Sequence, residues 1–200
     1  MFALVESGSI TKFLNGNRGI QIGDLKYPRA IYTLWTEAER NAINIYAVEY
    51  DDSNKKDERW YINTNQSYAF GSGKVTATYG TATARAHADT TWTAQDEEDE
   101  KGTEGEVKEE GLKTKLIRTV KEQAASQLAK TDWYITRKTE KSTAIPSAIT
   151  THRNLVRSRQ AAMETAITNA SDTPALETLY TYTKDSDGVV SRPLPEIPTL

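Results

Sequence analysis

The sequence predicts an α+β protein whose strands and helices lie in separate halves of the chain. Short runs rich in Thr and Tyr dominate residues 1–93, whereas apolar residues recur at helical spacing over 112–170. An acidic stretch at 94–111 separates these two modules, and a short strand pair with an extended, Pro-rich tail is expected at 171–200. We therefore expect a small strand-rich module with one short helix, an acidic linker, a helical hairpin and an irregular C-terminal segment.

The first module contains several short segments with the composition of strands. They lie at 2–5, 10–14, 45–50, 60–62, 67–70 and 75–79. Glycines at 71 and 73 predict a hairpin between the last two. Thr36 followed three residues later by Glu39 fits a capping box, so we expect a short helix at about 37–43. The strands favour Thr and Tyr over Val and Ile, which is typical of a sheet with one solvated face.

The acidic stretch has the composition of a linker. Residues 94–110 hold nine acids and two lysines, a net charge of −7, with two glycines and almost no apolar residue. Such a segment cannot offset its ordering entropy by burial, so we expect a linker or a mobile loop. A calcium site is the alternative, but the run lacks the spaced ligands and central glycine of an EF-hand loop.

Apolar residues in the second module predict two amphipathic helices that pair as a hairpin. One helix covers about 112–128, and another begins near Pro146. Thr131 and Asp132 are expected to cap a short helix that holds Trp133 and Ile135, with Asp132 capping the end at which Trp133 lies. Neither long helix can bury its apolar stripe alone, so the two pair with each other or with a partner. The residues expected to anchor the hairpin are Leu116, Val120, Leu128, Trp133, Ile149, Val156 and Met163.

The helical module is basic. Residues 112–170 hold eleven Lys and Arg against four acids, a net charge of +7, while the whole chain carries −3. Nucleic-acid binding is one interpretation of this charge. A solvated face compensated by the acidic linker is favoured, because no recognised nucleic-acid-binding motif accompanies it.

Little in the sequence indicates catalysis. The chain has no cysteine and two distant histidines, His87 and His152, which makes most metal and nucleophile sites hard to build. The glycines at 71 and 73 lack phosphate-loop spacing, and no G-x-S-x-G is present. We expect no enzyme, no catalytic, metal-binding or cofactor-binding residue and no cofactor. We also expect no signal peptide and no membrane span.

Two stretches resemble a known protein family. Residues 130–157 contain Thr131-Asp132-Trp133, Arg137-Lys138, Ile145-Pro146 and His152-Arg153, preceded by Leu128. This pattern resembles the C-terminal helical motif of small tailed-bacteriophage proteins, the tail assembly chaperone-like and tail-fibre-assembly-like family. Residues 27–52 resemble the N-terminal part of related phage tail proteins through Pro28, Trp35, a short acidic helix and Ile43-Asn44-Ile45-Tyr46.

The resemblance implies a structural component of a phage tail, such as a connector, baseplate or fibre-associated protein, that acts through protein–protein contacts. Its partners would be other tail proteins and further copies of itself, as a trimer or hexamer. It would lie in the virion, and in the host cytoplasm during assembly. The alternative is an assembly chaperone absent from the mature virion, although the C-terminal strand pair departs from the family pattern. A nucleic-acid-binding protein that uses the basic helices is the second alternative.

Overall fold

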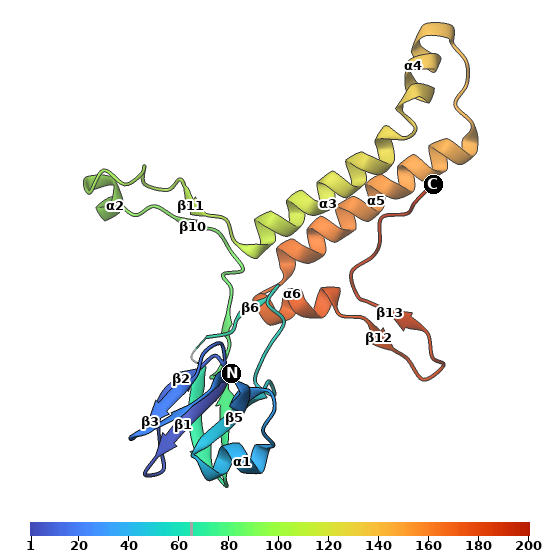
Figure 1. Ribbon diagram of the computed structural model, residues 1–200. Helices are drawn as coiled ribbons and strands as arrows, with labels where there is room; N and C mark the ends of the chain where they lie inside the picture. The colour runs from blue at the N-terminus through green and yellow to red at the C-terminus, as the bar shows by residue number, and fades with distance from the viewer. Residues whose placement is uncertain (65) are drawn as a thin grey trace. The chain divides into compact units, whose positions relative to one another are not determined.

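The computed structural model describes residues 1–64 and 66–200, which form two compact units, Met1–Thr83 and Ala84–Leu200 (Figure 1). The first unit is strand-rich and the second holds the long helices, which confirms the α+β prediction. The division precedes the predicted boundary at residue 93 because the intervening segment bonds to the helices. The backbone N–H groups of Leu112 and Lys113 donate to the carbonyls of Ala86 and His87, each at 2.9 Å.

A five-stranded sheet in the order β2-β1-β5-β8-β7 is the frame of the first unit. Neighbouring strands are antiparallel except β5 and β8, which run parallel with Val48 opposite Val75. The rings of Phe13 on β2 and Tyr68 on β7 have centroids 4.6 Å apart, so the sheet curls until its two edges approach. The strands are β1 (Phe2–Glu6), β2 (Ser9–Leu14), β5 (Ile45–Asp51), β7 (Ser67–Gly71) and β8 (Lys74–Thr78).

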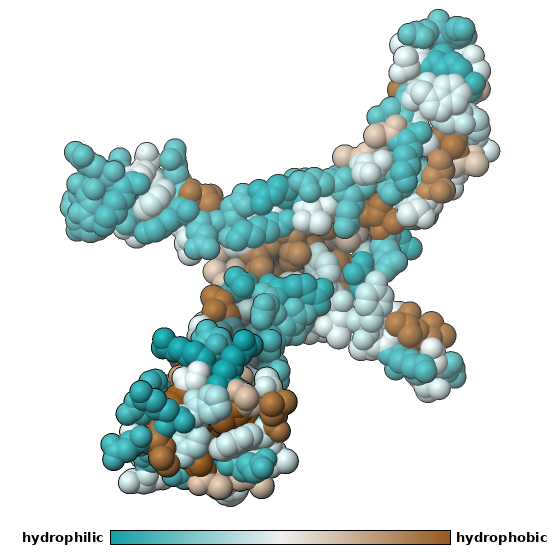
Figure 2. Space-filling view, viewed as in Figure 1, coloured by the Kyte–Doolittle hydropathy of each residue, from teal (hydrophilic) through white to brown (hydrophobic). Residues whose placement is uncertain are grey.

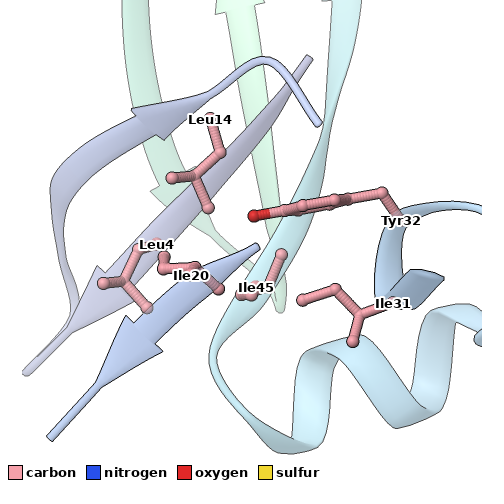
Figure 3. Packing of buried hydrophobic residues seen from close by; sticks show 6 residues of the cluster. All are labelled: Leu4, Leu14, Ile20, Ile31, Tyr32 and Ile45. Atoms are coloured by element: carbon pink, nitrogen blue, oxygen red, sulfur yellow. The ribbon is translucent and has the colours of Figure 1, made fainter. Parts of the chain in front are cut away.

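The period-two alternation of β1 and β5 directs side chains into two separate cores. One face of the sheet buries Ala3, Val5, Val48, Val75 and Ala77. The opposite face buries Leu4, Leu14, Ile20, Ile31, Tyr32 and Ile45, which converge in Figure 3. The expectation of one solvated face is therefore wrong for the central strands.

The second core exists because residues 20–32 fold over the sheet. They form β3 (Ile20–Ile22), β4 (Leu25–Tyr27) and the 3-10 helix η1 (Arg29–Tyr32). Gly23 has a φ of +56° in the β3–β4 turn, a conformation that glycine adopts without steric cost. These elements were not predicted, since strands of three residues carry little periodicity.

The predicted capping box is confirmed at α1 (Glu37–Ala42). The N–H of Thr36 donates to the Glu39 carboxylate at 2.7 Å, and the N–H of Glu39 donates to the Thr36 hydroxyl at 3.3 Å. The predicted 67–79 hairpin is confirmed as β7–β8. A short pair, β6 (Tyr61–Ile62) with β9 (Thr83–Ala84), lies where this unit ends.

The second unit is organised by α3 (Leu112–Ala129) and α5 (Ser147–Asn169), which pack along each other as the predicted hairpin. Apolar side chains gather along this pair in Figure 2. The connection between them is not a tight turn, because it carries α4 (Asp132–Lys141). Pro146 precedes α5, as predicted.

The chain beyond residue 170 is more regular than expected. Residues 171–200 were predicted to form only a short strand pair and an extended tail, but α6 (Thr173–Tyr180) occupies the first part of this segment. Asp172 caps this helix by accepting from the N–H of Ala175 at 2.8 Å, and Leu176 is fully buried. The predicted strand pair is confirmed in shorter form as β12 (Thr183–Lys184) and β13 (Val190–Ser191). The Pro-rich tail then packs back, with Leu194 buried.

We expect Ile45→Ala to destabilise the first unit by about 2–5 kcal/mol, because Ile45 is fully buried at the centre of the second core. Hydrogen exchange of β1 and β5 in denaturant would measure the loss. Leu34→Ala removes a similar volume from a residue that is 79% exposed, so it should leave the exchange unchanged. Equal effects of the two variants would contradict the assignment of this core.

Candidate interaction site on the helical hairpin

The predicted anchors of the hairpin divide into buried and exposed residues. Val120, Ile149, Val156 and Met163 are buried between the helices, and Leu116 and Leu128 are half-buried, as predicted. Trp133 is 52% exposed, so its prediction as a buried anchor is wrong. The physical reason is that α3 ends before it, and the apolar stripe of α3 does not continue into α4.

The far end of the hairpin is held instead by Arg153 of α5, whose side chain is almost completely buried. One terminal nitrogen of its guanidinium donates to the Leu128 carbonyl at 2.8 Å, the Thr131 hydroxyl at 2.6 Å and the Asp132 carboxylate at 2.8 Å. The first of these groups is a carbonyl in the last turn of α3, which also accepts from the backbone N–H of Thr131 at 3.0 Å. Arg153 therefore connects the end of α3, the start of α4 and the body of α5.

Asp132 has a different role from the predicted one. It is the first residue of α4, and the residue at the cap position is Thr131, whose hydroxyl donates to the Leu128 carbonyl at 3.0 Å. The carboxylate of Asp132 pairs with Arg153 rather than capping the helix. The pairs Thr131-Asp132 and His152-Arg153, which carry the family resemblance, are thus brought together in space. Sequence reasoning missed this contact. The only signal for it was that each pair lies near one end of a predicted helix.

Helix α4 presents an aromatic and cationic surface. The rings of Trp133 and Tyr134 have centroids 4.1 Å apart, and the Arg137 guanidinium lies 4.5 Å from the centroid of the first and 5.3 Å from the second. Ile135 is 40% exposed, and α4 contains no buried residue. Aromatic and arginine side chains of this kind are enriched in protein interfaces.

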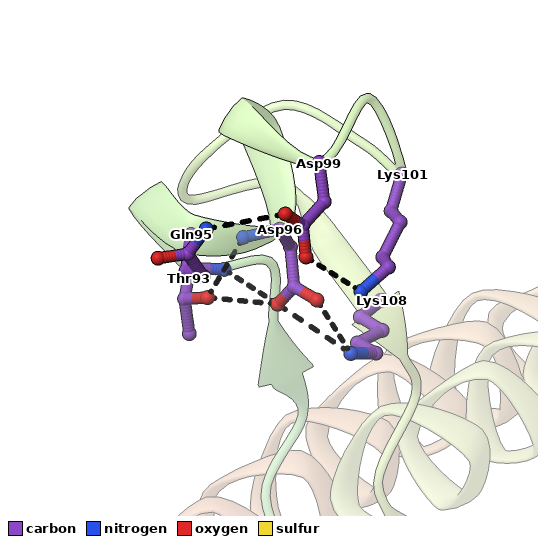
Figure 4. A network of polar contacts seen from close by, with 6 residues as sticks. All are labelled: Thr93, Gln95, Asp96, Asp99, Lys101 and Lys108. Carbon is purple, nitrogen blue, oxygen red and sulfur yellow. Dashed lines mark hydrogen bonds and ion pairs between the residues drawn. The ribbon is translucent and has the colours of Figure 1, made fainter.

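The acidic segment is folded rather than a simple linker. We call residues 90–110 the acidic arm; it contains β10 (Thr90–Thr91), α2 (Ala94–Glu98) and β11 (Val107–Glu109). Its acids stabilise it locally: Thr93 and Asp96 form a capping box, and Lys108 pairs with the same carboxylate at 3.3 Å (Figure 4). These polar contacts partly replace the missing apolar burial, which is why composition alone predicted a linker.

A small apolar contact also supports the arm. A β-carbon at Gly102 would lie 2.5 Å from the Trp92 ring, so the backbone packs directly against the indole. The Nζ atom of Lys108 lies 4.5 Å from the centroid of the same ring. The Trp92 ring thus packs between the backbone at Gly102 and the Lys108 side chain of β11.

The base of the acidic arm is fixed to the first turn of α3. Asp89 accepts from the Thr114 hydroxyl at 2.8 Å and from the Gly111 N–H at 2.7 Å, and these bonds hold its pKa below the usual range. Glu110 makes a two-pronged pair with Arg118 at 2.8 and 2.7 Å, which lowers the pKa of Glu110. These carboxylates also face the positive end of the helix dipole.

The other candidates from the sequence do not form a reactive site within the described part of the chain. His87 lies between β9 and β10 and His152 lies on α5, and no group of three His, Asp or Glu side chains there is placed to hold a metal. No helix among those residues is long and apolar enough to cross a bilayer. Comparisons with protein-family models, with curated proteins and with solved structures find no match to this chain.

We expect Arg153→Met to destabilise the second unit by about 3–5 kcal/mol, because it removes the three hydrogen bonds by which Arg153 holds the Leu128–Asp132 segment. Chemical denaturation followed by helical circular dichroism would measure this. Arg157→Met is the matched control, since Arg157 is exposed one turn further along the same helix. A loss below 1 kcal/mol for Arg153→Met would contradict the proposed junction.

The base of the arm should loosen in acid. A carboxylate with a lowered pKa stabilises the folded state above its ordinary pKa, and this contribution is lost as pH falls through the folded value. We therefore expect the Gly111 amide resonance to shift, and its exchange protection to fall, below about pH 4. Asp89→Asn should lack this transition. A transition that persists in the variant would assign the effect to another carboxylate.

Proposed function

We propose that this protein is a structural component of a bacteriophage tail, which acts as a connector, baseplate or fibre-associated protein through protein–protein contacts. The observation that carries the proposal is the Arg153 junction. It joins the residue pairs on which the phage resemblance rests, and beside it α4 displays its aromatic and cationic side chains.

Several features support a docking role over a catalytic one. The second unit extends short hairpins with exposed apolar side chains, including Val189 and Val190 at 58% and 60% exposure. Figure 2 shows apolar side chains at the end of the β12–β13 hairpin. Exposed apolar side chains of this type favour binding, because a partner that covers them removes their surface from water. Partners of this kind are other tail proteins or further copies of the chain.

An assembly chaperone would use the same surface. The two functions differ in whether the protein stays in the finished particle. We expect mass spectrometry of gradient-purified particles to detect the protein in threes or sixes per virion, relative to the major capsid protein. Antibody labelling of tails, with particles lacking this chain as control, would locate it. Absence from particles, with abundance in infected cells, would favour the chaperone and contradict a structural component.

Nucleic-acid binding is a second candidate because Trp133, Tyr134 and Arg137 form a stacked group within a basic segment. Such groups can stack on the bases of single strands. Affinity for single-stranded oligonucleotides should then fall steeply with salt, and Trp133→Ala should reduce it. Equal, weak binding by both forms would remove this candidate.

A further inference from the structure

The acidic arm carries more negative charge than its own lysines neutralise. Asp96 pairs with Lys108 and Asp99 pairs with Lys101. Within the described residues, no ion pair forms at several other exposed acids of the arm: Glu98, Glu100, Glu104, Glu106 and Glu109. A row of solvated carboxylates on a folded arm is therefore available to a partner.

Positive charge is in excess at the far end of the hairpin, residues 130–159. This segment holds seven Lys and Arg against two acids, a net charge of +5. Arg153 pairs with Asp132, and the remaining six cations make no ion pair within the part of the chain that the structure describes. The excess positive charge thus has no internal counterpart.

The acidic arm of the same chain is attached at the opposite end of α3 from this positive charge. Asp89 and Glu110 fix its base to the first turns of α3. The far end of the hairpin begins after α3, which has 18 residues and is about 27 Å long. This separation is several Debye lengths at physiological salt, so the two charges do not neutralise each other within one molecule.

We propose that the acidic arm, residues 90–110, of one copy docks on the far end of the hairpin, residues 130–159, of a second copy. The surface of Trp133, Tyr134 and Arg137 forms the floor of the contact, and the carboxylates of the arm pair with the surrounding Lys and Arg. This inference shares one premise with the proposed function, namely that both surfaces act through contacts with protein. The two surfaces differ, so repeated contacts close a ring or a reciprocal pair.

Sedimentation velocity of the purified full chain tests the proposal. We expect a concentration-dependent oligomer at 50 mM salt whose association constant falls at least tenfold at 500 mM salt. A chain that stays monomeric up to about 100 μM at low salt would overturn the proposal.

Charge reversal identifies the surfaces. The arm variant combines Glu98→Lys, Glu104→Lys and Glu106→Lys, and the hairpin variant combines Lys130→Glu, Lys138→Glu and Lys141→Glu. All six residues are exposed, and the arm substitutions leave its capping box and internal ion pairs intact. We expect each variant to lower the association constant at least tenfold, and a chain with all six changes to recover most of it.

A matched control reverses three exposed acids outside the arm: Asp24→Lys, Asp52→Lys and Asp187→Lys. It changes net charge as much as the arm variant does, and it should not weaken association. Equal weakening by the control, or failure of the six-residue chain to recover, would overturn the pairing. Circular dichroism of each variant checks that it is folded.

The experiment also separates this inference from its alternatives. If the arm variant leaves association unchanged while the hairpin variant loses only binding to a single-stranded RNA oligonucleotide, the hairpin surface serves nucleic acid and the inference is wrong. The proposed function is tested separately in virions. A monomer in solution that is present in particles would overturn this contact and leave the tail assignment standing.

Discussion

The guanidinium of Arg153 is the interaction on which the far end of the second unit depends. It is buried among helices, yet its main charge partner, Asp132, has a side chain that is 61% exposed. A cation in this position loses much of its hydration, and the two hydrogens of one terminal nitrogen, shared among three oxygens, offset part of that loss. Removing one acceptor would leave the others in place, whereas removing the guanidinium would leave the ends of two helices without a common partner. Arginine suits this role better than lysine because its charge is permanent and its donors are held in a rigid plane.

The distribution of charge follows from this architecture. Acids near the start of α3 lie close to the positive end of its dipole, where Asp89 and Glu110 also accept hydrogen bonds. The far end of the hairpin collects the basic residues, including Lys138 and Lys141 in the last turn of α4, where cations are favourable. A chain with a net charge of only −3 thereby has two ends of opposite sign within one unit.

The sequence was informative where structure depends on local signals. The capping box at Thr36, the glycines of the β7–β8 turn and the proline before α5 act over a few residues, and each was recognised. Contacts between distant residues were not accessible in this way. The burial of Arg153 depends on oxygens more than twenty positions earlier, and no pattern on α5 distinguishes it from the exposed Arg157. Trp133 was misjudged for the same reason, because its exposure depends on the break between α3 and α4.

The parallel pairing of β5 with β8 has a consequence for how the first unit folds. The hairpins β1–β2 and β7–β8 join neighbours in the chain and can close within microseconds. The β5–β8 pair joins Val48 to Val75, and the β1–β5 pair joins Leu4 to Ile45, so both close long loops and form later than the hairpins. Until β5 has paired on both sides, the apolar faces of both hairpins are open to solvent, and the newly made chain is most prone to aggregation in this interval.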